Sequence, residues 1–321
     1  MKLLDIFIIS GWINFIFSLS WGLFVFLKNY KDKINISFLL LTLSIAFWSL
    51  GYANWLTSTS HSEAFLWLHI LNLGSFLIPL FYLLWVSYIT SYHQINKIIF
   101  VFGIFVTILL FLYIIKPNLF VVSLAKKSIF DFWPDAGPFY KFYIILDYLI
   151  LFLIAQIILF IKFLKTNIKY EKLKYLTIFV TALLGFSGGF TNFFLWYDIY
   201  ILPWGNLLVG IFPIIFGWAT LRIGLFNIKI LAAEFFVYLI NMISIMRIFY
   251  YRNYLELFFN LIFGLLIFLF SLMLLRSVIR EVEQKEKLEE LNRLKSEFLS
   301  FASHQVKAPM AVVKGYAELI M

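Results

Sequence analysis

Nine long apolar stretches follow one another along the chain, and they constrain its fold more than any other feature. A helix that crosses the roughly 30 Å hydrocarbon core of a membrane needs about 20 mostly apolar residues, because lipid offers no hydrogen bonds to the backbone. The sequence therefore predicts an all-α fold, a polytopic membrane helix bundle of about nine spans. The predicted spans are 4–27, 34–56, 64–89, 98–115, 140–164, 175–197, 201–221, 230–248 and 254–275.

Composition supports a membrane protein. The chain is 63% hydrophobic and 13% charged, against roughly 45–50% apolar and 25% charged residues in soluble domains. The net charge of +9 comes from Lys and Arg placed between the apolar stretches rather than in one patch, so we predict a lipid bilayer and no nucleic acid as partner. The lack of cysteine excludes disulfides, thiolate metal sites and cysteine nucleophiles.

The positive charges also predict the orientation in the membrane. Lys and Arg in short connecting segments are retained on the cytoplasmic side, and they are frequent after the first, third, fifth and seventh spans. Those segments are therefore inside, the N-terminus is outside and the C-terminus is cytoplasmic, as an odd number of spans also requires. The contrast is weakened by cations in the opposite set, namely Lys116, Lys126, Lys127, Lys141, Arg247 and Arg252.

The longest segment between the spans of the membrane part, 116–138, faces outward in this orientation and contains the sequence FDFWPDAGP. Aromatic residues gather at membrane interfaces. We interpret the segment as an interfacial cap, with a ligand lid as the alternative.

A few polar residues fall within the predicted spans. Asp147 and Glu234 are the clearest, and a charge at mid-span costs about 2.5–3.5 kcal/mol. They are candidates for signal sensing, although a hydrogen bond between helices is the interpretation we favour for each. His69, Asn72, Gln156 and Asn192 are weaker candidates. The glycine-rich run 185–193 predicts closely packed helices.

Composition changes abruptly after residue 275. Segment 276–297 is rich in charge, and an apolar seam with spacings of three and four begins within it and continues beyond it. The seam residues are Leu288, Leu291, Leu294, Phe298 and Phe301. This pattern predicts an amphipathic helix that continues from the last span. We favour a dimeric coiled coil over a solvated linker helix without a partner.

The last stretch, 294–321, reads LKSEFLSFASHQVKAPMAVVKGYAELIM. Its string from Ser303 to Pro309, with His304 followed by Gln305, an aliphatic residue and Lys307, resembles the phosphoacceptor helix of bacterial sensor histidine kinases. That match covers about the last tenth of the chain. The first seven spans resemble in layout the seven-helix N-terminal modules of some of these kinases.

This resemblance implies a function. His304 would accept a phosphoryl group from ATP and pass it to an aspartate of a response regulator in a two-component system. If Phe298, Phe301 and Gln305 continue the seam, His304 lies at its accessible edge, where a neutral imidazole can act as a nucleophile. Lys307 would neutralise phosphate oxygens. The resemblance further implies a homodimer in the bacterial plasma membrane.

Three departures from the family pattern limit this interpretation. Gln305 stands where Glu or Asp is common, and an amide is a poor base. Ala308 stands where Thr or Asn often positions water, which predicts weak regulator-phosphatase activity. The sequence also ends within the first helix of the expected hairpin. ATP and Mg²⁺ are therefore expected on a downstream domain that this chain lacks, and the chain alone is not expected to be active.

We accordingly predict four parts. They are a seven-span sensor module (1–226), two further spans (227–275), a cytoplasmic signalling helix (276–297) and the start of a dimerisation and phosphoacceptor domain (298–321). The alternatives are a polytopic transporter or receptor with an interaction coil, and a non-catalytic anchor. A transporter predicts an internal repeat with paired broken helices, and no convincing repeat is present in the sequence.

Overall fold

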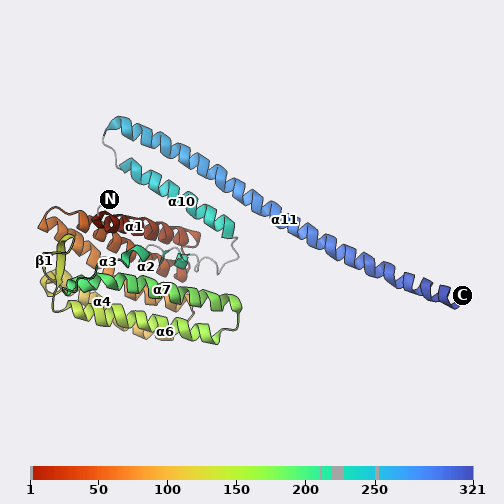
Figure 1. Cartoon of the computed structure of the whole chain (residues 1–321), viewed down its shortest axis with the longest axis horizontal. Helices are drawn as coiled ribbons and strands as arrows, with labels where there is room; N and C mark the ends of the chain where they lie inside the picture. Colours follow the sequence, from red (N-terminus) through yellow and green to blue (C-terminus); the bar gives the residue numbers. More distant parts are fainter. Residues whose placement is uncertain (1–2, 210–211, 214, 218–227, 250–252, 321) are drawn as a thin grey trace. The chain divides into compact units, whose positions relative to one another are not determined.

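The computed structural model describes residues 3–209, 212–213, 215–217, 228–249 and 253–320 (Figure 1). By its contacts the chain divides into two compact units, Met1–Leu225 and Phe226–Met321. Most of the described residues are helical, as the sequence predicts. The described residues also contain two strands, which form one two-stranded sheet.

The first unit is a bundle of long helices with a strand pair at one end (Figure 1). Its helices are α1 (Leu3–Lys28), α2 (Lys33–Thr57), α3 (His61–Ile89), α4 (Asn96–Ile115), α5 (Tyr140–Phe142), α6 (Ile150–Lys165), α7 (Lys169–Trp196) and α8 (Asn206–Val209). Single turns of 3₁₀-helix, η1 (His93–Ile95) and η2 (Pro117–Leu119), flank α4, and a π-helical segment, η3 (Tyr143–Leu149), joins α5 to α6.

Polar side chains fix where α2 and α3 begin. The Asp32 carboxylate accepts a hydrogen bond from the backbone N–H of Ile34 (2.9 Å) at the start of α2. At the start of α3, Ser60 Oγ accepts from the N–H of Glu63, and Glu63 Oε2 accepts from the N–H of Thr59. These contacts satisfy donors that the first turn of a helix leaves free, so the short connection between α2 and α3 is defined by its sequence.

Two glycines allow α2 and α3 to pack with their backbones in contact. A Cβ atom built on Gly51 of α2 would lie 2.5 Å from the backbone nitrogen of Leu71 in α3. One built on Gly74 of α3 would lie 2.5 Å from the Ser44 carbonyl oxygen and 2.6 Å from the Trp48 nitrogen of α2. Helix α2 also packs against α1, and α3 also packs against α4 and α6.

The segment predicted as an outward cap is a β-hairpin, which the sequence analysis did not foresee. Strands β1 (Val121–Lys127) and β2 (Phe130–Ala136) are antiparallel, with Val121 opposite Ala136 and Lys127 opposite Phe130. The two-residue turn begins at Ser128, whose φ is 54°. A turn of this length usually carries Asn or Gly at such a position, and this sequence lacks that signal.

Seven helices among the described residues are long and apolar enough to cross a membrane, rather than the nine predicted. They are Leu3–Lys28, Lys33–Thr57, His61–Ile89, His93–Ile115, Tyr140–Lys165, Lys169–Trp196 and Tyr254–Lys285. Most of the predicted span 201–221 beyond Val209 lies outside the described residues. The predicted span 230–248 is helical, but polar residues such as Glu234 and Asn241 interrupt its apolar sequence, and it is not among the seven.

The outer surface of the first unit is apolar. Large side chains on α4, among them Phe100, Phe111 and Ile114, are well exposed. A soluble protein rarely leaves such an extended apolar surface in water, so this face of α4 is suited to contact with lipid chains.

The described residues of the second unit contain two helices. They are α10 (Ile228–Phe249) and α11 (Tyr254–Ile320), and Asn241 Nδ2 of α10 donates a hydrogen bond to Ser271 Oγ of α11 (2.9 Å). Helix α11 runs for 67 residues without interruption. It therefore carries the last candidate span and the His304 motif on one continuous helix (Figure 1).

The backbone contact between α2 and α3 generates a prediction. Gly74→Ala places a methyl group against backbone atoms of α2, which cannot move without shifting the helix. We therefore expect the free energy of unfolding to fall by about 1–3 kcal/mol. The melting temperature of the purified protein in detergent measures this loss. Gly103→Ala is the matched control, because a Cβ there meets nothing within 4 Å. A Gly74→Ala protein that melts at or above the temperature of the control would contradict the close packing.

Candidate functional site

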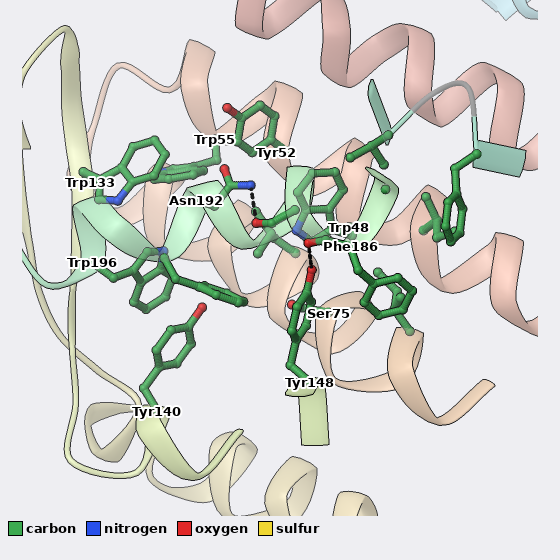
Figure 2. A pocket seen from close by; sticks show the side chains of 18 residues that line it. Trp48, Tyr52, Trp55, Ser75, Trp133, Tyr140, Tyr148, Phe186, Asn192 and Trp196 are labelled. Carbon is green, nitrogen blue, oxygen red and sulfur yellow. Dashed lines mark hydrogen bonds between the residues drawn. The ribbon is translucent and has the colours of Figure 1, made fainter. Parts of the chain in front are cut away.

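An aromatic cavity lies inside the first unit, between α2, α3 and α7 and next to the hairpin (Figure 2). Its free volume is about 60 Å³. The lining residues are Ile45, Trp48, Tyr52, Trp55, Leu71, Ser75, Ile78, Trp133, Tyr140, Tyr148, Gly185, Phe186, Gly189, Asn192, Phe193, Trp196, Val209 and Phe212. Because the largest share of these side chains is aromatic, the walls present flat apolar faces.

Rings from different elements stack around this cavity. Tyr140 of α5 lies parallel to Trp196 of α7, with ring centroids 3.9 Å apart. Trp55 of α2 contacts Trp133 of β2 at 4.7 Å, and Figure 2 shows these four rings grouped on one side. Aromatic contacts of this kind add roughly 0.5–1.5 kcal/mol each beyond the area they bury. These ring contacts hold the helix ends and the hairpin in one fixed arrangement.

Several polar groups of the wall are already hydrogen-bonded to protein. Asn192 and Asn206 exchange side-chain hydrogen bonds of 2.6 and 2.9 Å. The Tyr148 hydroxyl donates to the Phe186 carbonyl (2.5 Å), and Ser75 shares a hydrogen bond with Tyr143 (2.5 Å). These hydrogen bonds satisfy the polar groups within the protein, which is necessary because lipid chains offer no hydrogen-bond partners.

The hairpin is tied to the bundle by a buried lysine. Lys127 is only 2% exposed, and its Nζ atom lies 2.6 Å from Asp135 Oδ1 in β2 and 2.9 Å from Asp198 Oδ1 after α7. The same ammonium donates to the carbonyl oxygen of Leu195 (2.8 Å), in the last turn of α7. Ser123 of β1 donates a hydrogen bond to the second oxygen of Asp135. We call these residues the Lys127 cluster.

The electrostatics of the Lys127 cluster favour its charged form. Burial by itself lowers the pKa of Lys127, but hydrogen bonds and negative charge from Asp135 and Asp198 outweigh burial and raise it. Burial by itself raises the pKa of Asp135, but Lys127 and Ser123 outweigh burial and lower it. A cation at the end of α7 also interacts favourably with the helix dipole.

The sequence pattern predicts neither this cluster nor the cavity. In the sequence, Lys127 is only one of the cations that weaken the charge contrast between the two sides of the membrane. A signal was present, since two strand-length runs flank Ser128, with Lys127 at the end of the first and Asp135 near the end of the second. Asp198, which lies far along the chain at a φ of 60°, joins them only through the fold.

Asp147 is fully buried in the π-helical segment η3. Neither carboxyl oxygen has a hydrogen-bond partner in the described part of the chain, so the favoured bond between helices is not formed, and the side chain does not reach the surface. An unpartnered carboxyl group inside a membrane helix is costly, and π-helical turns are frequent at functional sites. Signal sensing by Asp147 stays a prediction.

The remaining predicted polar residues are spread over different elements. Glu234 is half-buried on α10, in the second unit. Asn72 donates to the Tyr113 hydroxyl (2.9 Å), and His69 Nδ1 contacts the Phe65 carbonyl oxygen (2.7 Å). Gln156 is buried, and neither its amide oxygen nor its nitrogen has a partner in the described part. In the glycine-rich run, Gly188 packs directly on Gly205, which confirms close packing there.

The predicted phosphoacceptor residues lie on α11. His304, Gln305 and Lys307 are part of its helical backbone, and their side chains are outside what the structure describes. Their catalytic roles stay predictions. In the described residues no group of three or more His, Asp or Glu side chains is placed to hold a metal ion.

The buried lysine generates a second prediction. Lys127→Met removes the cation and leaves Asp135 and Asp198 facing each other, so we expect faster hydrogen–deuterium exchange across residues 121–136. Lys126→Met is the matched control, because Lys126 and Asp131 form an exposed pair and such pairs contribute little. Equal exchange in the two variants would show that the cluster does not hold the hairpin.

The pH dependence follows from Asp135. Its pKa in the folded protein is below the unfolded value of about 3.9, so its stabilising effect is complete above that value and is lost as the pH falls through the folded pKa. We expect hairpin exchange, corrected for intrinsic rates, to stay constant from pH 7 to 5 and to rise below about pH 4. Asp135→Asn should remove this rise, and a rise that persists in the variant would point to another group.

Comparison with known proteins identifies the larger unit. No curated protein and no solved structure matches the chain. The family described as the N-terminal 7TM region of histidine kinase matches residues 11–229, more than half of the chain, and this range contains the cavity and the hairpin. With seven helices able to span a membrane, the protein is a multi-pass membrane protein. The chain belongs to the family of N-terminal seven-transmembrane regions of histidine kinases.

Proposed function

We propose that this chain is the sensing and phosphoacceptor portion of a sensor histidine kinase in a bacterial two-component system. His304 accepts a phosphoryl group from ATP and passes it to an aspartate of a response regulator. ATP and Mg²⁺ are held by a domain or partner outside this chain. The proposal rests on the family of residues 11–229 together with the His304 motif.

The continuity of α11 is the observation that carries the proposal. One helix runs from Tyr254 to Ile320 and includes both the candidate span Tyr254–Lys285 and His304. At 1.5 Å per residue, His304 lies about 30 Å along the helix from the end of that span. A rotation or tilt of the span is therefore transmitted to His304 without an intervening flexible joint.

An exposed apolar seam on α11 supports a homodimer. Leu288, Leu291 and Leu294 are each about half exposed or more in the single chain, and Phe298 is 68% exposed. Their spacing of three and four residues is typical of a coiled-coil interface. A second copy of α11 covers this seam, and the neighbouring His304 stays accessible at its edge.

The chemistry requires little from the protein beyond positioning and charge neutralisation. A neutral imidazole nitrogen of His304 attacks the γ-phosphorus of ATP, the bond to the bridging oxygen breaks, and ADP leaves. A carboxylate oxygen of the response regulator then attacks the phosphorus and restores neutral His304. Gln305 orients the imidazole, and Lys307, about one helical turn from His304, neutralises phosphate oxygens.

The proposed orientation assigns the two ends of the protein to different compartments. The N-terminus and the hairpin face outward, and the C-terminus with His304 lies in the cytoplasm, where ATP and response regulators are available. Lysines after the first, third and fifth spans support this arrangement. A signal received from outside thus acts on a bundle that is covalently joined to the phosphoacceptor helix.

Phosphorylation tests the proposal. We expect His304→Asn to abolish incorporation of labelled phosphate from ATP, because the amide is not a nucleophile under these conditions. The protein is assayed in its native membranes, so that any domain or partner that binds ATP is present, and acid-labile, alkali-stable label is counted. His93→Asn is the control, since His93 is exposed in a short 3₁₀ turn of the first unit. Undiminished histidine-linked label in His304→Asn would overturn the assignment.

A further inference from the structure

We propose that the aromatic cavity of the first unit is a binding site for a small uncharged aromatic molecule with a carbonyl oxygen, which accepts a hydrogen bond from the Trp133 Nε1–H. Binding there requires no phosphorylation and does not involve α11. The inference therefore goes beyond the proposed function, and either can fail alone.

The size of the cavity limits the ligand to a single substituted ring. Its free volume is about 60 Å³, and one water needs about 10–15 Å³ by this measure. The space thus corresponds to roughly four to six waters. Such a volume accommodates one six-membered ring with a short substituent but no fused ring system or lipid headgroup.

The walls exclude a charged ligand. None of the lining residues that the structure describes carries a charged side chain, and the carboxamide of Asn192 is hydrogen-bonded to Asn206. Transfer of an ion into such a place without a counter-charge is strongly unfavourable. The aromatic side chains of the wall instead offer apolar contact to a flat molecule (Figure 2).

Two buried donors in the wall, the Trp133 indole N–H and the Tyr52 hydroxyl, lack a hydrogen-bond partner among the described residues. Trp133 is fully buried, and its Nε1–H has no acceptor among the described residues. Its neighbour Trp55, only 4.7 Å away between ring centroids, donates instead to the Phe132 carbonyl oxygen (2.7 Å). Leaving a buried donor unpaired costs about 1–3 kcal/mol, and a carbonyl oxygen on the ligand removes that cost.

The Lys127 cluster keeps the Trp133 donor in place. Trp133 lies on β2 two residues before Asp135, which is paired with Lys127. Lys127 in turn bonds the Leu195 carbonyl oxygen, next to the lining residue Trp196. The hairpin wall and the α7 wall of the cavity are thus joined by one ammonium group, so the donor is preorganised for a ligand.

Two probes of nearly equal shape test the site. We would measure binding of 4-fluoroacetophenone and 1-ethyl-4-fluorobenzene by ¹⁹F NMR to the whole chain in nanodiscs, with empty nanodiscs correcting for partition into lipid. Only the first probe has a carbonyl oxygen. We expect it to bind roughly threefold to tenfold more tightly than the second, the ratio of a single neutral hydrogen bond.

Trp133→Phe is the decisive variant, because it keeps a ring and removes the donor. The two probes should then bind this variant with equal affinity, and the affinity for the ethyl compound should be the same as in the wild-type protein. Trp12→Phe is the control, since Trp12 of α1 does not line the cavity, and it should keep the wild-type ratio. Binding of neither probe above empty nanodiscs, or an undiminished ratio in Trp133→Phe, overturns the proposal.

A second variant keeps the proposal testable if Trp133→Phe loses both probes through misfolding. Leu71→Phe fills the cavity from α3 and leaves Trp133 intact. Loss of both probes in a Leu71→Phe protein with the wild-type melting temperature supports the site. Retention of both probes places them elsewhere and overturns it.

Discussion

The absence of hydrogen-bonding solvent in the membrane is the constraint on which the rest of this structure depends. Each long apolar stretch satisfies its own backbone by forming a helix, and polar side chains inside the bundle pair where they can, as Asn192 does with Asn206. The strands occur in 116–138, outside the spans. Asp147 departs from this pattern, because it is buried without a hydrogen-bond partner within the described residues.

Packing inside the first unit combines two opposite kinds of side chain. Glycines bring backbones together, at Gly51 and Gly74 between α2 and α3 and at Gly188 against Gly205. Large aromatic rings fill the wider spaces, and where they do not fill them completely the cavity remains. The Lys127 cluster joins the hairpin to α7 through one buried ammonium group. The hairpin that carries the lining residue Trp133 is thus anchored to α7.

The two units carry different parts of the function that we propose. The seven-transmembrane region contains the cavity, the Lys127 cluster and Asp147, and we assign none of them to phosphoryl transfer. Helix α11 contains the His304 motif and an exposed apolar seam. In the function that we propose, a small rotation or tilt of α11 changes how His304 is presented.

The amino-acid order alone was enough for the helices, the family and the candidate phosphoacceptor. Apolar length predicts spans directly, and the string around His304 is a local motif. Three features required the tertiary structure. The hairpin lacks the usual turn residues, the cavity draws on residues from Ile45 to Phe212, and Asp198 meets Lys127 across 71 positions. Contacts between residues so distant in the chain leave no periodic pattern, because folding rather than local preference brings them together.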